Sequence, residues 1–253
     1  MSGQIASRPS GRPLPDGAKG EKADRPPVTI DRMMSRLKDR SKPFGSLARS
    51  FDSKVLGYTA ALFAVLPFLV LYIDGSVKTF ILSVQSDWGL MVAGAITALG
   101  YGLTNAIMAA ILLVIGLKAG KPREAIAGRL GLLAVIVGSL SVQVLKHLFC
   151  RSRPLAEKSG QFFVEFPCLG KGSGLISFPS GHSVTAFALA FVLSRAYPRC
   201  ALLFYGLAGL VALSRVYLAK HFPSDVVAGA AIGLLAGWIV CRFSAFSLVH
   251  GHT

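Results

Sequence analysis

A succession of long apolar runs, separated by short polar breaks, constrains this sequence more than any other feature. About 20 apolar residues are enough for a helix to cross the hydrocarbon core of a bilayer. The pattern therefore predicts an all-α fold, a multi-pass transmembrane helical bundle with about six spans. The runs cover residues 55–73, 88–117, 130–149, 179–197, 200–218 and 223–243.

The composition supports the same class of protein. Hydrophobic residues make up 53% of the chain and charged residues 15%, with a mean hydropathy of +0.57, whereas a soluble domain carries about 25% charged residues. The run 88–117 is too long for one upright helix, so its first part is expected to lie at the membrane interface near Trp88, Gly100 and Gly102. The last three runs are rich in Ala, Gly and Ser, which favours close helix packing in lipid.

The N-terminal segment has a different character. Residues 1–29 are rich in Pro, Gly, Ser and charge and are expected to be disordered. Residues 30–40 are compatible with a short amphipathic helix on an anionic membrane surface, or with a continuation of the disordered tail. The predicted organisation is a basic cytoplasmic tail over 1–54 with anionic lipid headgroups nearby, a six-span membrane domain over 55–243, and a short tail over 244–253.

The net charge of +15 indicates a membrane topology signal and an anionic substrate. No nucleic-acid-binding motif is present, so we expect no nucleic acid partner. Basic residues gather in the N-terminal tail and in the loops after the second and fourth runs, which share one side of the membrane if there are six crossings. The positive-inside rule then predicts cytoplasmic termini. We expect a bacterial inner membrane protein; nothing in the sequence indicates its oligomeric state.

Three polar blocks lie at the ends of the apolar runs. KHLFCRSRP (146–154) ends the third run, PSGH (179–182) begins the fourth, and SRVYLAKHFPSD (214–225) joins the fifth to the sixth. Because successive spans alternate in direction, all three blocks are predicted to meet on one face of the membrane. That face is extracytoplasmic if the termini are cytoplasmic.

The residue types in these blocks suit the binding of a phosphate-like dianion. Lys146, Arg153 and Arg215 would repel one another near the hydrocarbon boundary, and a bound dianion would offset that repulsion. Ser180 and Gly181 stand at a predicted helix start, where free N–H groups and the helix dipole favour an anion.

The histidines of these blocks suit covalent or acid–base chemistry. His221 and Asp225 are four residues apart, so the carboxylate can hold one imidazole nitrogen and leave the other free as a nucleophile or base. His182 is then available to protonate a leaving oxygen. Each of these residues alone is more often structural, but their joint occurrence on one face favours an enzyme.

The loop after the third run carries further charges and two cysteines. We expect its charged side chains to be solvated; they are Arg151, Glu157, Lys158, Glu165 and Lys171. No cysteine spacing typical of a zinc site is present, so no metal site is expected. Cys150 and Cys168 lie on the predicted outer face, and a disulfide between them is a hypothesis. Cys200 and Cys241 are expected to be reduced.

The motifs K-x6-RP (146–154), PSGH (179–182) and SR-x5-H-x3-D (214–225) resemble those of the type 2 phosphatidic acid phosphatase superfamily at every motif position. The resemblance covers residues 55–243 and leaves the N-terminal tail outside. It implies a helical bundle with an extracytoplasmic site and a metal-independent phosphatase that needs no cofactor. Soluble vanadium haloperoxidases are similar at these motifs, but the six apolar runs argue against that branch.

The resemblance also implies a role for each motif residue. His221 would attack phosphorus and become a phosphohistidine, Asp225 would orient it, and His182 would protonate the leaving group. The phosphoryl oxygens would be held by Lys146, Arg153, Ser180, Gly181 and Arg215.

The function expected from the resemblance is hydrolysis of a phosphomonoester or diphosphate on a membrane lipid. Four substrates are open: phosphatidic acid, phosphatidylglycerol phosphate, undecaprenyl diphosphate and lipid A 1-phosphate. Two alternatives also stay open, a lipid-to-lipid phosphotransferase and a non-catalytic lipid binder on the same scaffold.

Overall fold

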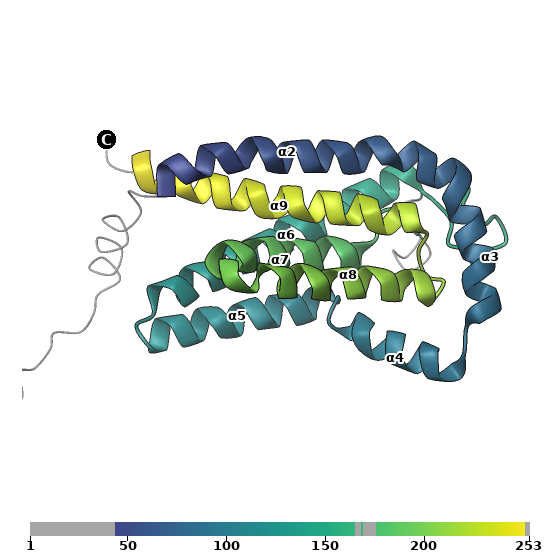
Figure 1. Ribbon diagram of the computed structural model, residues 1–253, viewed down its shortest axis with the longest axis horizontal. Helices are drawn as coiled ribbons and strands as arrows, with labels where there is room; N and C mark the ends of the chain where they lie inside the picture. The colour runs from purple at the N-terminus through teal and green to yellow at the C-terminus, as the bar shows by residue number, and fades with distance from the viewer. Residues whose placement is uncertain (1–43, 165–167, 169–175, 251–253) are drawn as a thin grey trace, which may run out of the picture.

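The computed structural model describes residues 44–164, 168 and 176–250, and these residues form helices and loops without a β-strand (Figure 1). The predicted all-α bundle is therefore confirmed. In chain order the elements are α2 (Phe44–Phe68), a π-helical turn (Leu69–Ile73), α3 (Asp74–Val84), α4 (Asp87–Ala98), α5 (Gly102–Lys118), α6 (Pro122–Phe149), α7 (Gly181–Ala196), a 3-10 turn (Pro198–Cys200), α8 (Ala201–Tyr217) and α9 (Pro223–His250).

Four helical segments in the described part of the chain are long and apolar enough to cross a membrane, and the bent pair α4–α5 adds a fifth if it counts as one span. The segments are Lys54–Val84, Pro122–Phe149, Pro198–Tyr217 and Pro223–Ser244. The remaining predicted run forms α7, whose 16 residues rise about 24 Å, less than the hydrocarbon core of about 30 Å. Because α7 packs against α5, α6, α8 and α9, lipid contact does not set its length.

The helices are arranged so that the three motif blocks meet at one end of the bundle. The start of α2 and the end of α9 lie together at the opposite end, while α3 stands across the end where α8 turns into α9 (Figure 1). At that end the backbone N–H of Ser180, before α7, donates to the carbonyl of Asp225 in α9 at 3.0 Å. The three blocks therefore lie together at one end of the bundle, and their common position on one face of the membrane stays a prediction.

One element differs from the sequence prediction. α2 begins at Phe44 and α9 ends at His250, but the apolar spans within them begin at Lys54 and end at Ser244, next to the predicted bounds of 55 and 243. α3 was not predicted, and it continues from α2 through the π-helical turn. The expected N-terminal disorder, the surface helix over 30–40 and the lipid contacts of the tail fall mostly on residues 1–43, which lie outside the described residues.

The long run 88–117 is divided into α4 and α5 between Ala98 and Gly102, and the interfacial position expected for its first part stays a prediction. α4 and α5 meet at an angle of 46°, and the side-chain amide of Asn105 donates to the carbonyls of Leu99 and Tyr101 at 3.0 Å each. Gly100 permits the bend to approach α8 and α7, because a Cβ there would lie 2.4 Å from Val211 Cγ1 of α8 and 3.0 Å from His182 Cβ of α7.

Glycines on α9 let it approach α7 closely. A Cβ at Gly229 would lie 2.6 Å from the carbonyl oxygen of Ser180, and one at Gly233 would lie 2.4 Å from that of Val184. Side-chain atoms essentially never come this close to a backbone oxygen, so only glycine fits without movement. The start of α7, where PSGH lies, is thus placed by direct backbone packing on α9.

Gly229→Ala is expected to lower the free energy of unfolding by about 1–3 kcal/mol, because overpacking forces the start of α7 away from α9. Thermal unfolding in detergent measures the effect. Gly206→Ala on α8 is the matched control, since no atom lies within 4 Å of the Cβ it would add. Equal unfolding midpoints for the two variants would show that the close approach of α9 to α7 does not contribute to stability.

Candidate active site

Residues from all three motif blocks line a cavity of about 490 Å³. Six of the eight site residues predicted from sequence line it: Lys146, Arg153, Gly181, His182, Arg215 and His221. The other two, Ser180 and Asp225, are fully buried behind them. Ser180 precedes the first residue of α7 and its hydroxyl accepts a hydrogen bond from Ser183 at 3.1 Å. The structure therefore collects all eight predicted residues at one site, with two of them in a supporting layer.

Three nitrogen atoms of the cavity-lining residues are buried without a hydrogen-bond partner among the described residues. They are Nε of Arg153, Nε2 of His182 and Nε of Arg215. Arg215 uses another nitrogen, Nη1, to donate to Thr97 at 2.9 Å, which orients its guanidinium. Buried polar groups are normally paired, so three unpaired nitrogens around one cavity indicate a site built for a ligand with several acceptor oxygens.

His221 lies in the short loop between α8 and α9 and is backed by Asp225 in the first turn of α9. The distance from His221 Nδ1 to Asp225 Oδ2 is 3.7 Å, and Ser177 Oγ lies 3.5 Å from the same Nδ1. Asp225 Oδ2 also accepts hydrogen bonds from the hydroxyl of Ser177 and from the backbone N–H of Phe222. Burial, partly offset by Asp225, lowers the pKa of His221 to about 4.

Arg151 is the main correction to the sequence prediction. It was expected in a solvated loop, yet its side chain is only 2% exposed. Its Nη1 donates to Asp225 Oδ1 at 2.6 Å and its Nη2 to Asp74 Oδ2 at 2.7 Å. Its guanidinium lies over the rings of Phe162 and Phe222, at 4.6 and 4.2 Å from their centroids. The other predicted loop charges fit better: Glu157 and Lys158 are exposed, while Glu165 and Lys171 lie outside the described residues.

Asp74, the first residue of α3, joins α3 to the nucleophile candidate. Its Oδ1 accepts from the backbone N–H of Ser224 at 3.0 Å, and its Oδ2 accepts from the Ser224 hydroxyl. Arg151 therefore bridges two carboxylates, one from α3 and one that stands behind His221. The sequence offered one signal for this pair, because Asp74 follows directly on an apolar span, where a charge is costly without a partner.

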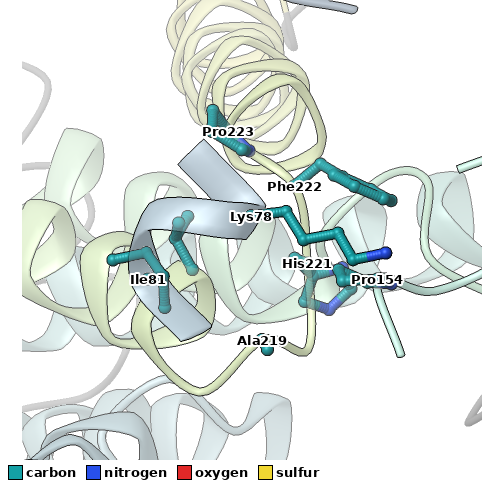
Figure 2. Close-up of a pocket in the computed structure, with 8 residues that line it drawn as sticks. Lys78, Ile81, Pro154, Ala219, His221, Phe222 and Pro223 are labelled. Atoms are coloured by element: carbon teal, nitrogen blue, oxygen red, sulfur yellow. The ribbon is translucent and has the colours of Figure 1, made fainter. Parts of the chain in front are cut away.

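α3 also covers the side of His221 away from the large cavity. Figure 2 shows Lys78 and Ile81 of α3 close to His221, Phe222 and Pro154. The space among them is only about 10 Å³, and Lys78 Nζ donates to Ser159 at 2.8 Å. Among the described residues this side of the imidazole is therefore packed, and the large cavity is the wider approach to His221.

The loop that carries Arg153 is braced by the disulfide that the sequence hypothesis named. Cys150 ends α6 in the left-handed conformation (φ 45°) and is bonded to Cys168, with 6.0 Å between their Cα atoms. Near this brace, Lys146 Nζ donates to the carbonyl of Ile176 at 3.1 Å. Cys200 and Cys241 are free, as expected.

The fold and the site together define a multi-pass membrane protein with a cavity lined by three cationic side chains and two histidines. A family model described as the PAP2 superfamily matches residues 128–247. Phosphatidylglycerophosphatase B of Bacillus subtilis is 30% identical over 181 residues, which are 67% of this chain and 82% of that protein. The chain belongs to the PAP2 superfamily, the type 2 phosphatidic acid phosphatases that its motifs resemble.

Other relatives match over shorter regions. A lipid A 1-phosphatase of Rhizobium etli is 35% identical over 104 residues, 41% of this chain and 43% of that protein. The chain thus spans less than half the length of this relative. The crystal structure of a PAP2-type phosphatidylglycerolphosphate phosphatase from Bacillus subtilis superposes with a TM-score of 0.54 at 27% identity, covering 74% of this chain and 95% of the other. LpxE of Aquifex aeolicus, at 24% identity and a TM-score of 0.54 over 68% of this chain and 96% of its own, shows the same fold.

Proposed function

We propose that this protein is an integral-membrane lipid phosphatase that works through a phosphohistidine at His221. The observation that carries the proposal is the set of unpaired buried nitrogens of Arg153, His182 and Arg215 beside His221. A phosphoryl group supplies the oxygen acceptors that these nitrogens lack. The related proteins named phosphatidylglycerophosphatase B and lipid A 1-phosphatase support a membrane lipid phosphate as the substrate.

The first step transfers the phosphoryl group to the enzyme. His221, oriented through Nδ1 by Asp225, attacks phosphorus with its other nitrogen, Nε2. The bond from phosphorus to the lipid oxygen breaks, and His182 gives that oxygen a proton. Lys146, Arg153 and Arg215, with the N–H groups at Gly181, stabilise the charge on the transferred phosphoryl oxygens.

The second step releases phosphate. Water attacks the phosphohistidine, His182 takes a proton from that water, and the bond from phosphorus to Nε2 breaks. Free phosphate and neutral His221 result, so the cycle closes without a redox change or a further reactant.

The proposal includes a topology. The start of α2 and the end of α9 would lie on the cytoplasmic side of a bacterial inner membrane, with the cavity at the extracytoplasmic end. This follows from the excess of Lys and Arg in the loops and tail at the terminal end. Cysteine labelling of Cys200, which is exposed and free near that end, tests it in intact and lysed cells. Labelling of Cys200 in intact cells by a membrane-impermeant reagent would contradict this topology and indicate the opposite one.

Phosphate release by purified protein tests the proposed activity. The substrates are phosphatidic acid, phosphatidylglycerol phosphate, undecaprenyl diphosphate and lipid A 1-phosphate, with EDTA present throughout. Release from at least one lipid, unchanged by EDTA, is expected. Radiolabel found in a second lipid instead of free phosphate would indicate a phosphotransferase, and binding without any transfer would indicate a non-catalytic lipid binder.

The pH dependence of kcat/KM is expected to show no loss from protonation of His221 until about pH 4. This ratio reports groups of the free enzyme, and the neutral imidazole that can attack predominates above its pKa of about 4. Initial rates from pH 4 to 8, corrected for the separately titrated lipid phosphate, provide the measurement. If the corrected profile of kcat/KM instead falls on the acid side with a midpoint at about pH 6.5, the ordinary pKa of histidine, that result would contradict the environment described for His221.

A further inference from the structure

The cavity continues beyond the phosphate-binding residues along one face of α6. Ser139, Gln143 and Lys146 all line it, and their spacing of four and three residues places them on the same side of the helix. Ser139 precedes Lys146 by about two helical turns, so the lining reaches about 10 Å from Lys146 along the helix axis. That direction leads away from the end of α6 at Phe149 and into the span Pro122–Phe149.

This part of the cavity opens toward the surface that faces lipid. Tyr101 at the start of α5 and Gln143 on α6 both line the cavity and are both exposed. The apolar side chains next to them on these helices, Leu103, Leu140 and Val144, are also exposed, at 73%, 63% and 61%. Exposed apolar side chains on membrane helices contact acyl chains. The chains of a bound lipid can therefore leave the cavity beside Gln143 of α6, past Tyr101 at the start of α5.

Gln143 and Ser139 have no hydrogen-bond partner within the described residues. Polar side chains inside a membrane span are costly unless something pairs with them. Thr185, a third polar residue of this lining, differs because its hydroxyl donates to the carbonyl of Gly100 at 2.9 Å. The Ser139 hydroxyl lies next to Gly102, where an added Cβ would be 3.5 Å from it.

We infer that Ser139 and Gln143 form a headgroup subsite that binds hydroxyl, ester or amide groups of the lipid next to its phosphate. The preferred substrates are then phosphomonoesters of acylated glycerol or of an acylated aminosugar, rather than prenyl phosphates. This inference rests on the proposed function. The carboxamide of Gln143 both donates and accepts hydrogen bonds, which suits these groups, whereas a prenyl chain would leave both side chains unpaired in apolar surroundings.

The ratio of kcat/KM for two kinds of lipid tests the subsite. Phosphatidic acid and an N-acylated glucosamine 1-phosphate lipid carry the polar groups, and farnesyl phosphate is the comparator without them. Gln143→Leu is expected to lower kcat/KM for at least one polar lipid about tenfold, the loss of a hydrogen bond worth roughly 1.4 kcal/mol, and to leave farnesyl phosphate unchanged. Ser139→Ala is expected to act in the same direction. The polar lipid whose kcat/KM falls more identifies the preferred headgroup as glycerol or aminosugar.

Controls separate the subsite from folding and from the phosphatase activity itself. Leu133→Met, at an exposed position of α6 that does not line the cavity, should change neither ratio, and inhibition by inorganic phosphate should be the same in all variants. An equal fall in kcat/KM for all three lipids, or no fall for any of them, would overturn the subsite but leave the proposed phosphatase activity in place. Failure of the unsubstituted protein to release phosphate from any lipid would overturn the proposed function and the subsite together.

Discussion

His221→Ala is expected to lower phosphate release from lipid phosphates by more than about 10⁴-fold. Loss of a covalent nucleophile has the largest effect that a single catalytic substitution produces, and the remaining site can stabilise charge but cannot form the intermediate. Among the histidine side chains that the structure describes, His221 is the one with a carboxylate behind it and a packed wall on its far side. Single-turnover rates with the lipid on which the protein is most active give the measurement.

His147→Gln is the matched control for that substitution. His147 lies on α6 one residue after Lys146 but does not line the cavity, and its Nδ1 contacts the carbonyl of Cys168 at 3.2 Å. A glutamine can keep a donor for that carbonyl, so kcat/KM should stay within about threefold. Residual activity of His221→Ala above a tenth of the control would mean that another group, or water directly, attacks phosphorus.

Arg151→Met is expected to lower the free energy of unfolding by about 3–5 kcal/mol, because it leaves the buried carboxylates of Asp74 and Asp225 without their cation. kcat should fall as well, by roughly a hundredfold, since Asp225 would no longer hold His221 in place. Thermal midpoints in detergent, and kcat measured well below the lower midpoint, separate the two effects.

Two further variants test whether Arg151 acts through the paired carboxylates. Lys158→Met removes an exposed cation of the same loop and should change the midpoint little. Asp74→Asn combined with Arg151→Met removes one of the stranded charges and should recover part of the lost stability. Equal midpoints for Arg151→Met and Lys158→Met would show that the buried pairs contribute nothing.

The sequence predicts the bundle and the cavity-facing residues because both depend on local patterns. Apolar length sets the spans, and parity of crossings places Lys146, His182 and His221 at one end. The bend between α4 and α5 is also predictable, since the run 88–117 exceeds one span and contains Gly100 and Gly102.

The supporting layer behind His221 could not be predicted in the same way. Arg151 has the same immediate setting as Lys158, a polar loop after a span, and only the fold distinguishes them. Its burial depends on Asp74, 77 residues earlier, and on the rings of Phe162 and Phe222. α3 was missed because the first apolar run is followed directly by Asp74 and Gly75, a pair typical of a turn, and by several polar residues.

The extension of the cavity along α6 could not be predicted from the sequence either. Gln143 in a span looks like a helix-packing residue in sequence, as Asn105 does. The structure separates them, because Asn105 bonds to backbone carbonyls while Gln143 lines the cavity.

The central claim is that His221 carries the phosphoryl group, and rapid quenching with a lipid labelled on its phosphoryl group tests it most directly. The account predicts a base-stable, acid-labile label that maps to the peptide containing His221, disappears on a chase with unlabelled lipid, and is absent from His221→Ala. Full turnover with no labelled protein at any time, or a label on another residue, would contradict it.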